Sequence, residues 1–196
     1  MDRAADCRDP ATGQRPAGKG QTGPRDGGLP VGQLRRRLRG MSGPALLVSV
    51  RDPDEVTAAV AGGAAIIDIK DPSRGSLGRA SAAAVAACAA AVPPRLPWTF
   101  AAGELRDLAG AAAGLLGRQL VGIVSQPAAI KFGLAGCCGT DWSESLARVA
   151  RQFPVATAAV PVAYADARRA EAARVDDVID QAASRGFPLV LIDTLT

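Results

Sequence analysis

Two lysines stand out in this sequence because of where they occur. The chain holds twenty arginines but three lysines, and Lys70 and Lys131 lie at the ends of short apolar runs. A lysine inside an apolar strand loses hydration, which lowers its pKa and frees its amine to attack a carbonyl carbon. Asp68 and Lys70, two residues apart, point to the same side of a strand. A buried Asp68–Lys70 ion pair, with Lys131 as a strand-end cation, explains these residues equally well.

The absence of histidine narrows the remaining chemistry. The 196 residues contain none, which excludes the usual serine and cysteine triads and histidine-bearing zinc sites. The four cysteines, at positions 7, 88, 137 and 138, form no C-x-x-C pair, so no zinc ribbon or thioredoxin-like motif is present. Acid–base chemistry must therefore come from carboxylates, lysine, tyrosine or a thiol. So few cysteines favour a reduced, cytoplasmic protein.

The positive charge is concentrated at the start of the chain. Residues 1–44 hold nine Lys or Arg against four Asp, whereas residues 45–196 hold fourteen against fifteen Asp or Glu. The sequence pI of about 9.2 therefore indicates no basic face on the folded part, and we expect no nucleic-acid partner. No apolar stretch approaches the roughly 18–20 residues needed to cross a bilayer, so we expect no membrane partner either.

We expect two parts, residues 1–43 as a disordered extension and residues 44–196 as the catalytic domain. The first part is rich in Gly, Pro and Arg and has few apolar residues to bury. Its basic run from Arg35 to Arg39 is interpreted as a solvated linker in preference to an anchor for RNA or an anionic surface. Met41 lies just before the first apolar strand, so a start codon assigned too far upstream also explains the pattern.

From residue 44 onward, apolar strands alternate with alanine-rich helices, which predicts an α/β fold with a parallel sheet. The turn after the first strand, Val50–Pro53, lacks the glycines of a dinucleotide-binding sheet. Polar residues instead follow several strands, as in (β/α)8 barrels. The strands expected are 44–50, 66–70, 97–102, 128–133, 155–164 and 189–193. The helices expected begin near Pro53 and end at Gly62–Gly63, and otherwise cover 81–91, 115–125, 141–153 and 174–185.

Several short motifs, in order from Ala45 to Thr196, resemble the (5-formylfuran-3-yl)methyl phosphate synthase family. The most specific block runs from Ile67 to Gly78 and includes Ile67-Asp68-Ile69-Lys70-Asp71-Pro72 and Gly75-Ser76-Leu77-Gly78. Shorter ones are Leu46–Val50, Ile130–Leu134, Tyr164–Ala167 and Leu191–Thr194. The resemblance implies a TIM-barrel Schiff-base lyase that condenses two molecules of glyceraldehyde 3-phosphate. Its product, a phosphorylated furan aldehyde, would serve the biosynthesis of methanofuran or a related one-carbon carrier.

Carried over position by position, Lys70 resembles the Schiff-base lysine, with Lys131 and Asp193 as its catalytic partners. Lys131 would bind a phosphate group or lower the pKa of Lys70 through the repulsion of two positive charges. Asp193 would give and take protons when water is eliminated from the condensed product. Asp68 is expected to orient Lys70. The substrate-binding candidates are completed by the loop residues Arg74, Gly75, Ser76 and Gly78, and by Tyr164 and Asp166. That loop is equally well explained as a tight turn, and the last pair as support for the fifth strand. The implied reaction requires no metal or cofactor. The sequence does not decide whether the protein forms a homo-oligomer.

The chain departs from this pattern in length. A barrel of this type needs about 200–250 residues, and we expect truncation after the sixth strand, with two unpaired sheet edges. The family's further lysine, just past the sixth strand, has no position here. Two alternatives remain: another Schiff-base sugar-phosphate aldolase, or an inactive barrel remnant or binding module acting through its basic tail.

Overall fold

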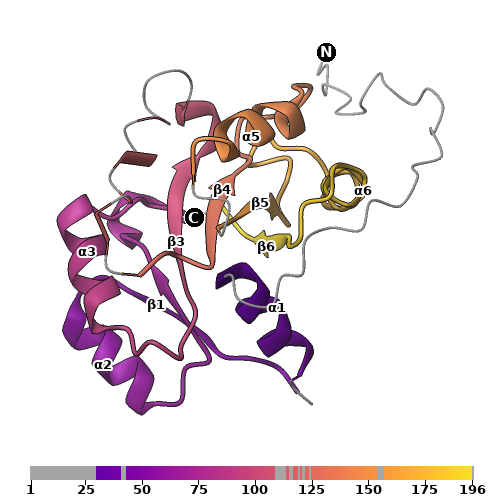
Figure 1. The fold of residues 1–196 in the computed structure, drawn as a ribbon. Helices are drawn as coiled ribbons and strands as arrows, with labels where there is room; N and C mark the ends of the chain where they lie inside the picture. The colour runs from indigo at the N-terminus through magenta and orange to yellow at the C-terminus, as the bar shows by residue number, and fades with distance from the viewer. Residues whose placement is uncertain are drawn as a thin grey trace.

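Six parallel strands form one curled sheet in the computed structural model, which describes residues 30–40, 43–108, 114, 117–118, 120, 122–123, 125–153 and 157–195. In the sheet each strand pairs with the next one in the chain (Figure 1). The strands are β1 (Leu47–Val50), β2 (Ile66–Ile69), β3 (Trp98–Glu104), β4 (Ala129–Gly133), β5 (Ala158–Tyr164) and β6 (Leu191–Asp193). This sequential order is that of a barrel wall, because a doubly wound sheet reverses its strand order. The prediction of α/β architecture with a barrel-type sheet is confirmed.

Helices connect most of the strands and cover the outside of the sheet. They are α2 (Pro53–Ala61), α3 (Ala82–Ala91), α5 (Trp142–Ala150) and α6 (Val175–Arg185), with 3-10 turns η1 (Pro72–Arg74) and η2 (Leu105–Leu108). The helix expected over 115–125 falls partly outside the described residues. None of the helices described is long and apolar enough to span a membrane.

The ends of α2 and α5 follow from local sequence chemistry. The Asp52 side chain accepts a hydrogen bond from the Glu55 N–H, and Pro53 occupies the first turn. Asp141 caps α5 in the same way, by accepting from the Glu144 N–H. At the far end of α2, Gly63 adopts a φ of 86°, a conformation that glycine reaches without strain. The predicted boundaries of both helices are confirmed to within a few residues.

The main core lies between the sheet and its outer helices. Ile67 and Ile69 of β2 are fully buried and belong to the same cluster as Val56 of α2 and Val85 and Cys88 of α3. Since side chains alternate along a strand, Asp68 and the residue after Ile69 must face the opposite side, the inside of the curl. The outward packing of the two isoleucines therefore positions the polar residues of β2.

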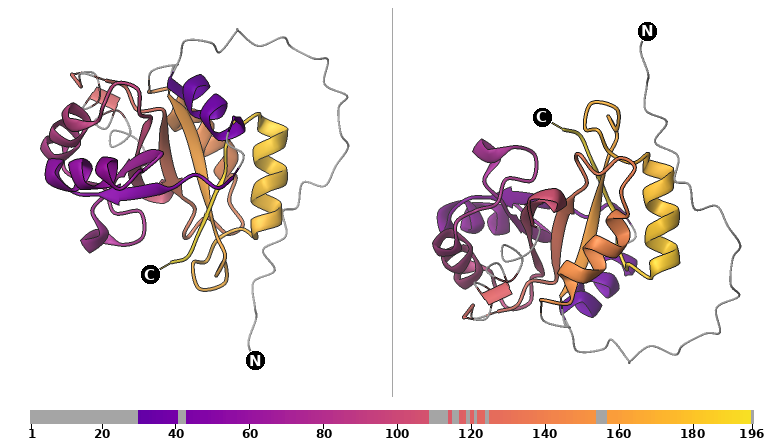
Figure 2. Two further views of the ribbon diagram at one scale, coloured as in Figure 1. Left: turned by 90° about the horizontal axis from the view of Figure 1, so that it is seen from below. Right: turned by 90° about the horizontal axis from the view of Figure 1, so that it is seen from above.

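Helix α1 (Pro30–Arg39) corrects the expectation that all of residues 1–43 are disordered. Leu34 is 2% exposed and packs with small residues at the starts of the strands, among them Ala65, Ala128 and Ala158. Figure 2 shows α1 lying against the strands. A single buried leucine in this arginine-rich helix can anchor α1 to the sheet because the small alanine side chains leave room for it. The expectation for residues 1–29 and 41–42 lies outside the described residues.

The two outermost strands carry exposed apolar side chains. β1 pairs only with β2, and β6 only with β5, within the described sheet. Leu46 and Leu47 at the first edge are 54% and 38% exposed, and Ile192 at the other is 54% exposed. The two unpaired, apolar edges expected from the sequence are therefore present.

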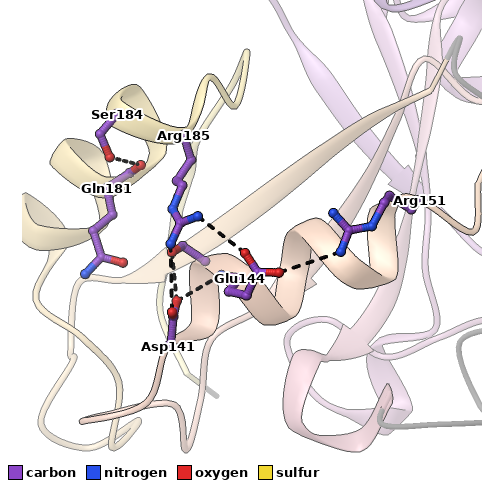
Figure 3. Close-up of polar contacts among 7 residues, drawn as sticks. Asp141, Glu144, Arg151, Gln181, Ser184 and Arg185 are labelled. Atoms are coloured by element: carbon purple, nitrogen blue, oxygen red, sulfur yellow. Dashed lines mark hydrogen bonds and ion pairs between the residues drawn. The ribbon is translucent and has the colours of Figure 1, made fainter. Parts of the chain in front are cut away.

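Helices α5 and α6 are joined by a surface network of charges (Figure 3). Arg185 lies 3.3 Å from a Glu144 carboxylate oxygen and 3.8 Å from one of Asp141. Arg151 lies 3.6 Å from the other oxygen of Glu144. These side chains are all about 40–66% exposed, so the network contributes little stability.

Candidate active site

Asp68 is the centre of a buried polar cluster inside the curl of the sheet. Its carboxylate is completely buried and accepts three hydrogen bonds, each from a different strand. The donors are Lys131 Nζ at 2.5 Å, Thr99 Oγ1 at 2.7 Å and Ser49 Oγ at 3.1 Å. The register of the sheet explains the arrangement, because Ser49 and Thr99 are the direct neighbours of Asp68 on β1 and β3. The cluster thus fixes a lysine and an aspartate as a pair in the barrel interior.

This pairing changes the roles expected of two residues. Asp68 was expected to orient Lys70, but its carboxylate is taken up by Lys131 and the two hydroxyls. The Lys131 side chain is 7% exposed, and the charge of its ammonium is compensated by Asp68. A cation held in this way is poorly placed to bind a phosphate from solution or to repel a proton on another lysine. Lys131 therefore lies in the site, in a setting that the sequence did not reveal.

Lys70 follows β2 and lies at the mouth of the curl, partly buried. Its Nζ donates a hydrogen bond to the backbone carbonyl of Ser76, 3.2 Å away. Within the described part of the chain, Lys70 takes part in no ion pair. The Lys70 side chain is thus held by one backbone carbonyl, whereas Lys131 is held by a carboxylate.

Ser76 links Lys70 to the segment that follows the last strand, β6. Its hydroxyl donates to the carbonyl oxygen of Thr194 at 2.9 Å, across 118 positions in the sequence. Thr194 follows directly on Asp193, the last residue of β6. Because Ser76 also receives the Lys70 hydrogen bond, the loop after β2 reaches across the mouth to the end of β6. The structure thus brings Lys70 and Asp193 to one end of the sheet.

The loop between Asp71 and Gly78 is a compact turn bonded mainly to itself. Gly75 N–H donates to the Pro72 carbonyl, and Gly78 N–H donates to the Gly75 carbonyl. A Cβ on Gly78 would lie within 1.9 Å of the Asp71 carbonyl oxygen, so this closure requires glycine. These two amides are occupied, which favours the tight-turn explanation over a phosphate cradle. Arg74 is exposed and lies 3.6 Å from the Asp71 carboxylate.

Glu104 is a residue of the mouth that sequence reasoning missed. One carboxylate oxygen accepts from the Tyr164 hydroxyl at 2.6 Å, and the other from the Ala135 N–H at 2.9 Å. A Cβ on Gly133 would lie 2.2 Å from this carboxylate, so the glycine of β4 leaves the space that Glu104 fills. The strand was expected to end at residue 102 but extends to Glu104. That two-residue difference places the carboxylate at a strand end, where barrels carry catalytic groups.

Tyr164 and Asp166, both predicted to bind substrate, have internal partners. Tyr164 is fully buried, and burial, followed by its bond to Glu104 and the nearby charges of Glu104, Asp193 and Asp166, raises its pKa above the ordinary value. Asp166 accepts a hydrogen bond from the Leu195 N–H at 2.9 Å. Asp193 accepts from the N–H of the next residue, also at 2.9 Å, and is the register neighbour of Tyr164. Tyr164 and Asp193 therefore lie side by side at the mouth.

Comparison with known proteins shows the family of the chain. The family model for 4-HFC-P synthase matches residues 46–196. The chain belongs to the 4-HFC-P synthase family. A (5-formylfuran-3-yl)methyl phosphate synthase of Methanopyrus kandleri is 31% identical over 159 residues, covering 77% of this chain and 64% of the relative. A Methylorubrum extorquens protein whose name gives the same activity is 35% identical over 153 residues, covering 77% of this chain and 57% of the relative.

Two features of these matches bear on the structure. The chain spans less than two thirds of the length of either curated relative. Among solved structures, a 2,3-dimethylmalate lyase of the PEP mutase/isocitrate lyase superfamily superposes with a TM-score of 0.52 at 12% identity, covering 84% of this chain and 61% of the other. This likeness concerns the fold alone. The family match begins at residue 46, so helix α1 lies outside it.

Proposed function

We propose that this protein acts as a Schiff-base lyase which condenses two molecules of glyceraldehyde 3-phosphate into (5-formylfuran-3-yl)methyl phosphate. The observation that carries the proposal is the different setting of the two lysines. Lys131 is paired with Asp68, whereas the Lys70 amine is held only by the carbonyl of Ser76 among the described hydrogen bonds and ion pairs. The product is taken from the name of the family and of its Methanopyrus kandleri member. The substrate and the covalent mechanism are part of the proposal.

The reaction begins when the neutral Lys70 amine attacks the carbonyl carbon of one triose phosphate and water leaves, forming an iminium ion. The iminium withdraws electrons from the adjacent carbon, which then loses a proton and attacks the carbonyl of the second triose phosphate. Forming the furan ring from the condensed chain requires loss of water and of one phosphate, a carbon–oxygen lyase reaction. These eliminations need a group that gives and takes protons, and we assign this role to Asp193 at the end of β6.

The buried Asp68–Lys131 pair contributes to this reaction through its electrostatic field. It holds a fixed positive charge and a fixed negative charge at 2.5 Å inside the sheet, beneath the strand ends. Such preorganised charges need no rearrangement during reaction and stabilise charge that develops on the substrate. In this proposal Lys131 acts as a local dipole with Asp68 and does not carry the phosphate.

The proposal is tested by incubating the protein with glyceraldehyde 3-phosphate and following ultraviolet absorption and mass of the products. We expect a furan aldehyde phosphate from the wild type and from Lys19→Arg, a matched control in the lysine outside the two strand ends. Lys70→Arg keeps the positive charge but has no usable nucleophile, and should give no product. A simple aldol product from the wild type would instead favour an ordinary Schiff-base aldolase. Product formation by Lys70→Arg would refute the proposal.

A further inference from the structure

The inside of the curled sheet is filled in levels, and the buried Asp68–Lys131 pair lies in the middle one. Below the pair, at the starts of the strands, Leu34 of α1 packs with small residues that include Ala129. Ala129 is two residues before Lys131 on β4, so its side chain faces the same side of the sheet. The floor of the interior is therefore covered by α1.

Leu77, from the loop after β2, fills the level above the pair. It is 2% exposed and packs with Ala101 and Val162 in a cluster separate from the outer core. Ala101 is the register neighbour of Lys131, and paired residues face the same side of a sheet. Val162 is two residues beyond Val160, the neighbour of Lys131 on β5. Leu77 therefore lies between the buried pair and the mouth.

Hydrogen bonds of Ser76 hold this loop in place. The Ser76 hydroxyl donates to the Thr194 carbonyl at 2.9 Å, and the Ser76 carbonyl accepts from Lys70 Nζ at 3.2 Å. At its base the loop is bonded to itself, because the Asp71 N–H donates to the Gly78 carbonyl at 2.8 Å. An outward swing of the loop thus breaks the contacts of Ser76 and leaves the turn itself intact.

The closed loop separates Lys70 from the charges beneath it. Lys70 is two residues beyond Asp68 and faces the same side of the sheet, about 6–7 Å nearer the mouth along the strand. The Asp68 and Lys131 side chains are 0% and 7% exposed. A ligand held at Lys70 comes into contact with the pair only by taking the space that Leu77 fills.

We propose that Leu77 closes the interior above the Asp68–Lys131 pair, and that residues 71–78 swing outward to admit a triose phosphate. The inference rests on the proposed function for the identity of the ligand, whereas the closure itself does not depend on it. Leu77 controls access to the pair and takes no part in the chemistry. The closed loop keeps water from the pair, and the incoming ligand takes the place of the leucine.

The test measures how fast acetic anhydride modifies Lys131 in the free protein, by digestion and mass spectrometry. Rates are compared at the same lysine across variants, so its intrinsic reactivity cancels. Alkylation of Cys88, in the outer core, measures global unfolding in parallel. Leu77→Ala opens the proposed path, and Ser76→Ala removes the hydroxyl that bonds to the end of β6. Leu146→Ala, at a fully buried leucine of α5 in the outer core, is the matched control.

We expect the rate at Lys131, relative to that at Cys88, to rise at least tenfold in Leu77→Ala and at least threefold in Ser76→Ala. Leu146→Ala should leave this ratio unchanged, and thermal melting checks that each variant is folded. An unchanged ratio in folded Leu77→Ala would overturn the closure, as would wild-type Lys131 reacting as fast as Lys70.

Two further outcomes are assigned in advance. If Leu77→Ala does not fold, Ser76→Ala decides the matter, and an unchanged ratio there refutes the closure. A wild-type protein that forms no furan product from glyceraldehyde 3-phosphate, but whose Lys131 becomes reactive in Leu77→Ala, would refute the proposed function and support the closure.

Discussion

Replacing Asp68 by asparagine removes the negative charge that holds Lys131 inside the barrel. The two side chains are 0% and 7% exposed, so solvent cannot take the place of the lost partner. Removing one member of a buried ion pair typically costs about 3–5 kcal/mol, because an uncompensated charge stays buried. Asparagine keeps the shape and can still accept from Thr99, so we expect the lower end, about 3 kcal/mol. For a chain of this size that corresponds to a fall of roughly 6–12 °C in melting temperature.

The assay is urea unfolding followed by the fluorescence of Trp98 and Trp142, both buried. Arg185→Ala, which breaks the exposed pairs of Figure 3, is the contrasting control and should cost about 0–1 kcal/mol. Adding Lys131→Met to Asp68→Asn should recover part of the loss, since no charge is then left unpaired. Equal and small effects of Asp68→Asn and Arg185→Ala would show that the buried pair does not hold the interior in place.

Three further predictions follow from burial. Leu34→Ala should destabilise the protein by about 2–5 kcal/mol in urea unfolding, while Leu38→Ala, one turn along the same helix and 37% exposed, should have almost no effect; equal effects would mean that α1 does not pack as described. Tyr164, the single tyrosine, should show tyrosinate absorption only at a pH above its ordinary pKa of 10.0, and stability should fall as pH rises through that range because the unfolded chain loses the proton first; ionisation near pH 10.0 in folded protein would contradict this. Burial raises the pKa of Cys88 to about 11, so its alkylation at pH 8 should be slow until the protein unfolds, and rapid labelling of native protein would be inconsistent with its place in the core.

Much of the fold could be predicted because each element carries its own local signal. Asp52 with Pro53 indicates the start of α2, and Asp141 the start of α5. The alternation of isoleucine with polar residues in β2 indicates which side faces the helices. Helix α1 lacked such a signal, since the burial of Leu34 depends on alanines of three distant strands. The composition of residues 30–39 alone cannot indicate that other segments of the chain form a pocket for Leu34.

Sequence reasoning proposed several residues of the candidate site but could not predict how they pair. Lys70, Lys131 and Asp193 were found because charged residues are unusual at the ends of apolar strands. The partner of Asp68 was not, because Lys131 is 63 positions away and its approach depends on the curl of the sheet. Glu104 was missed for a simpler reason, as its strand continues two residues past the apolar run. Long-range register decides these contacts, and a single sequence does not contain it in readable form.

The most direct test of the account is the site of covalent attachment. Folded protein would be treated with glyceraldehyde 3-phosphate and borohydride, digested, and mapped by mass spectrometry, with Lys70→Arg in parallel. The account predicts a reduced triose phosphate on the peptide that contains Lys70, and none in the variant. An adduct confined to Lys131, or no adduct on either lysine, would contradict the assignment of Lys70 as the nucleophile.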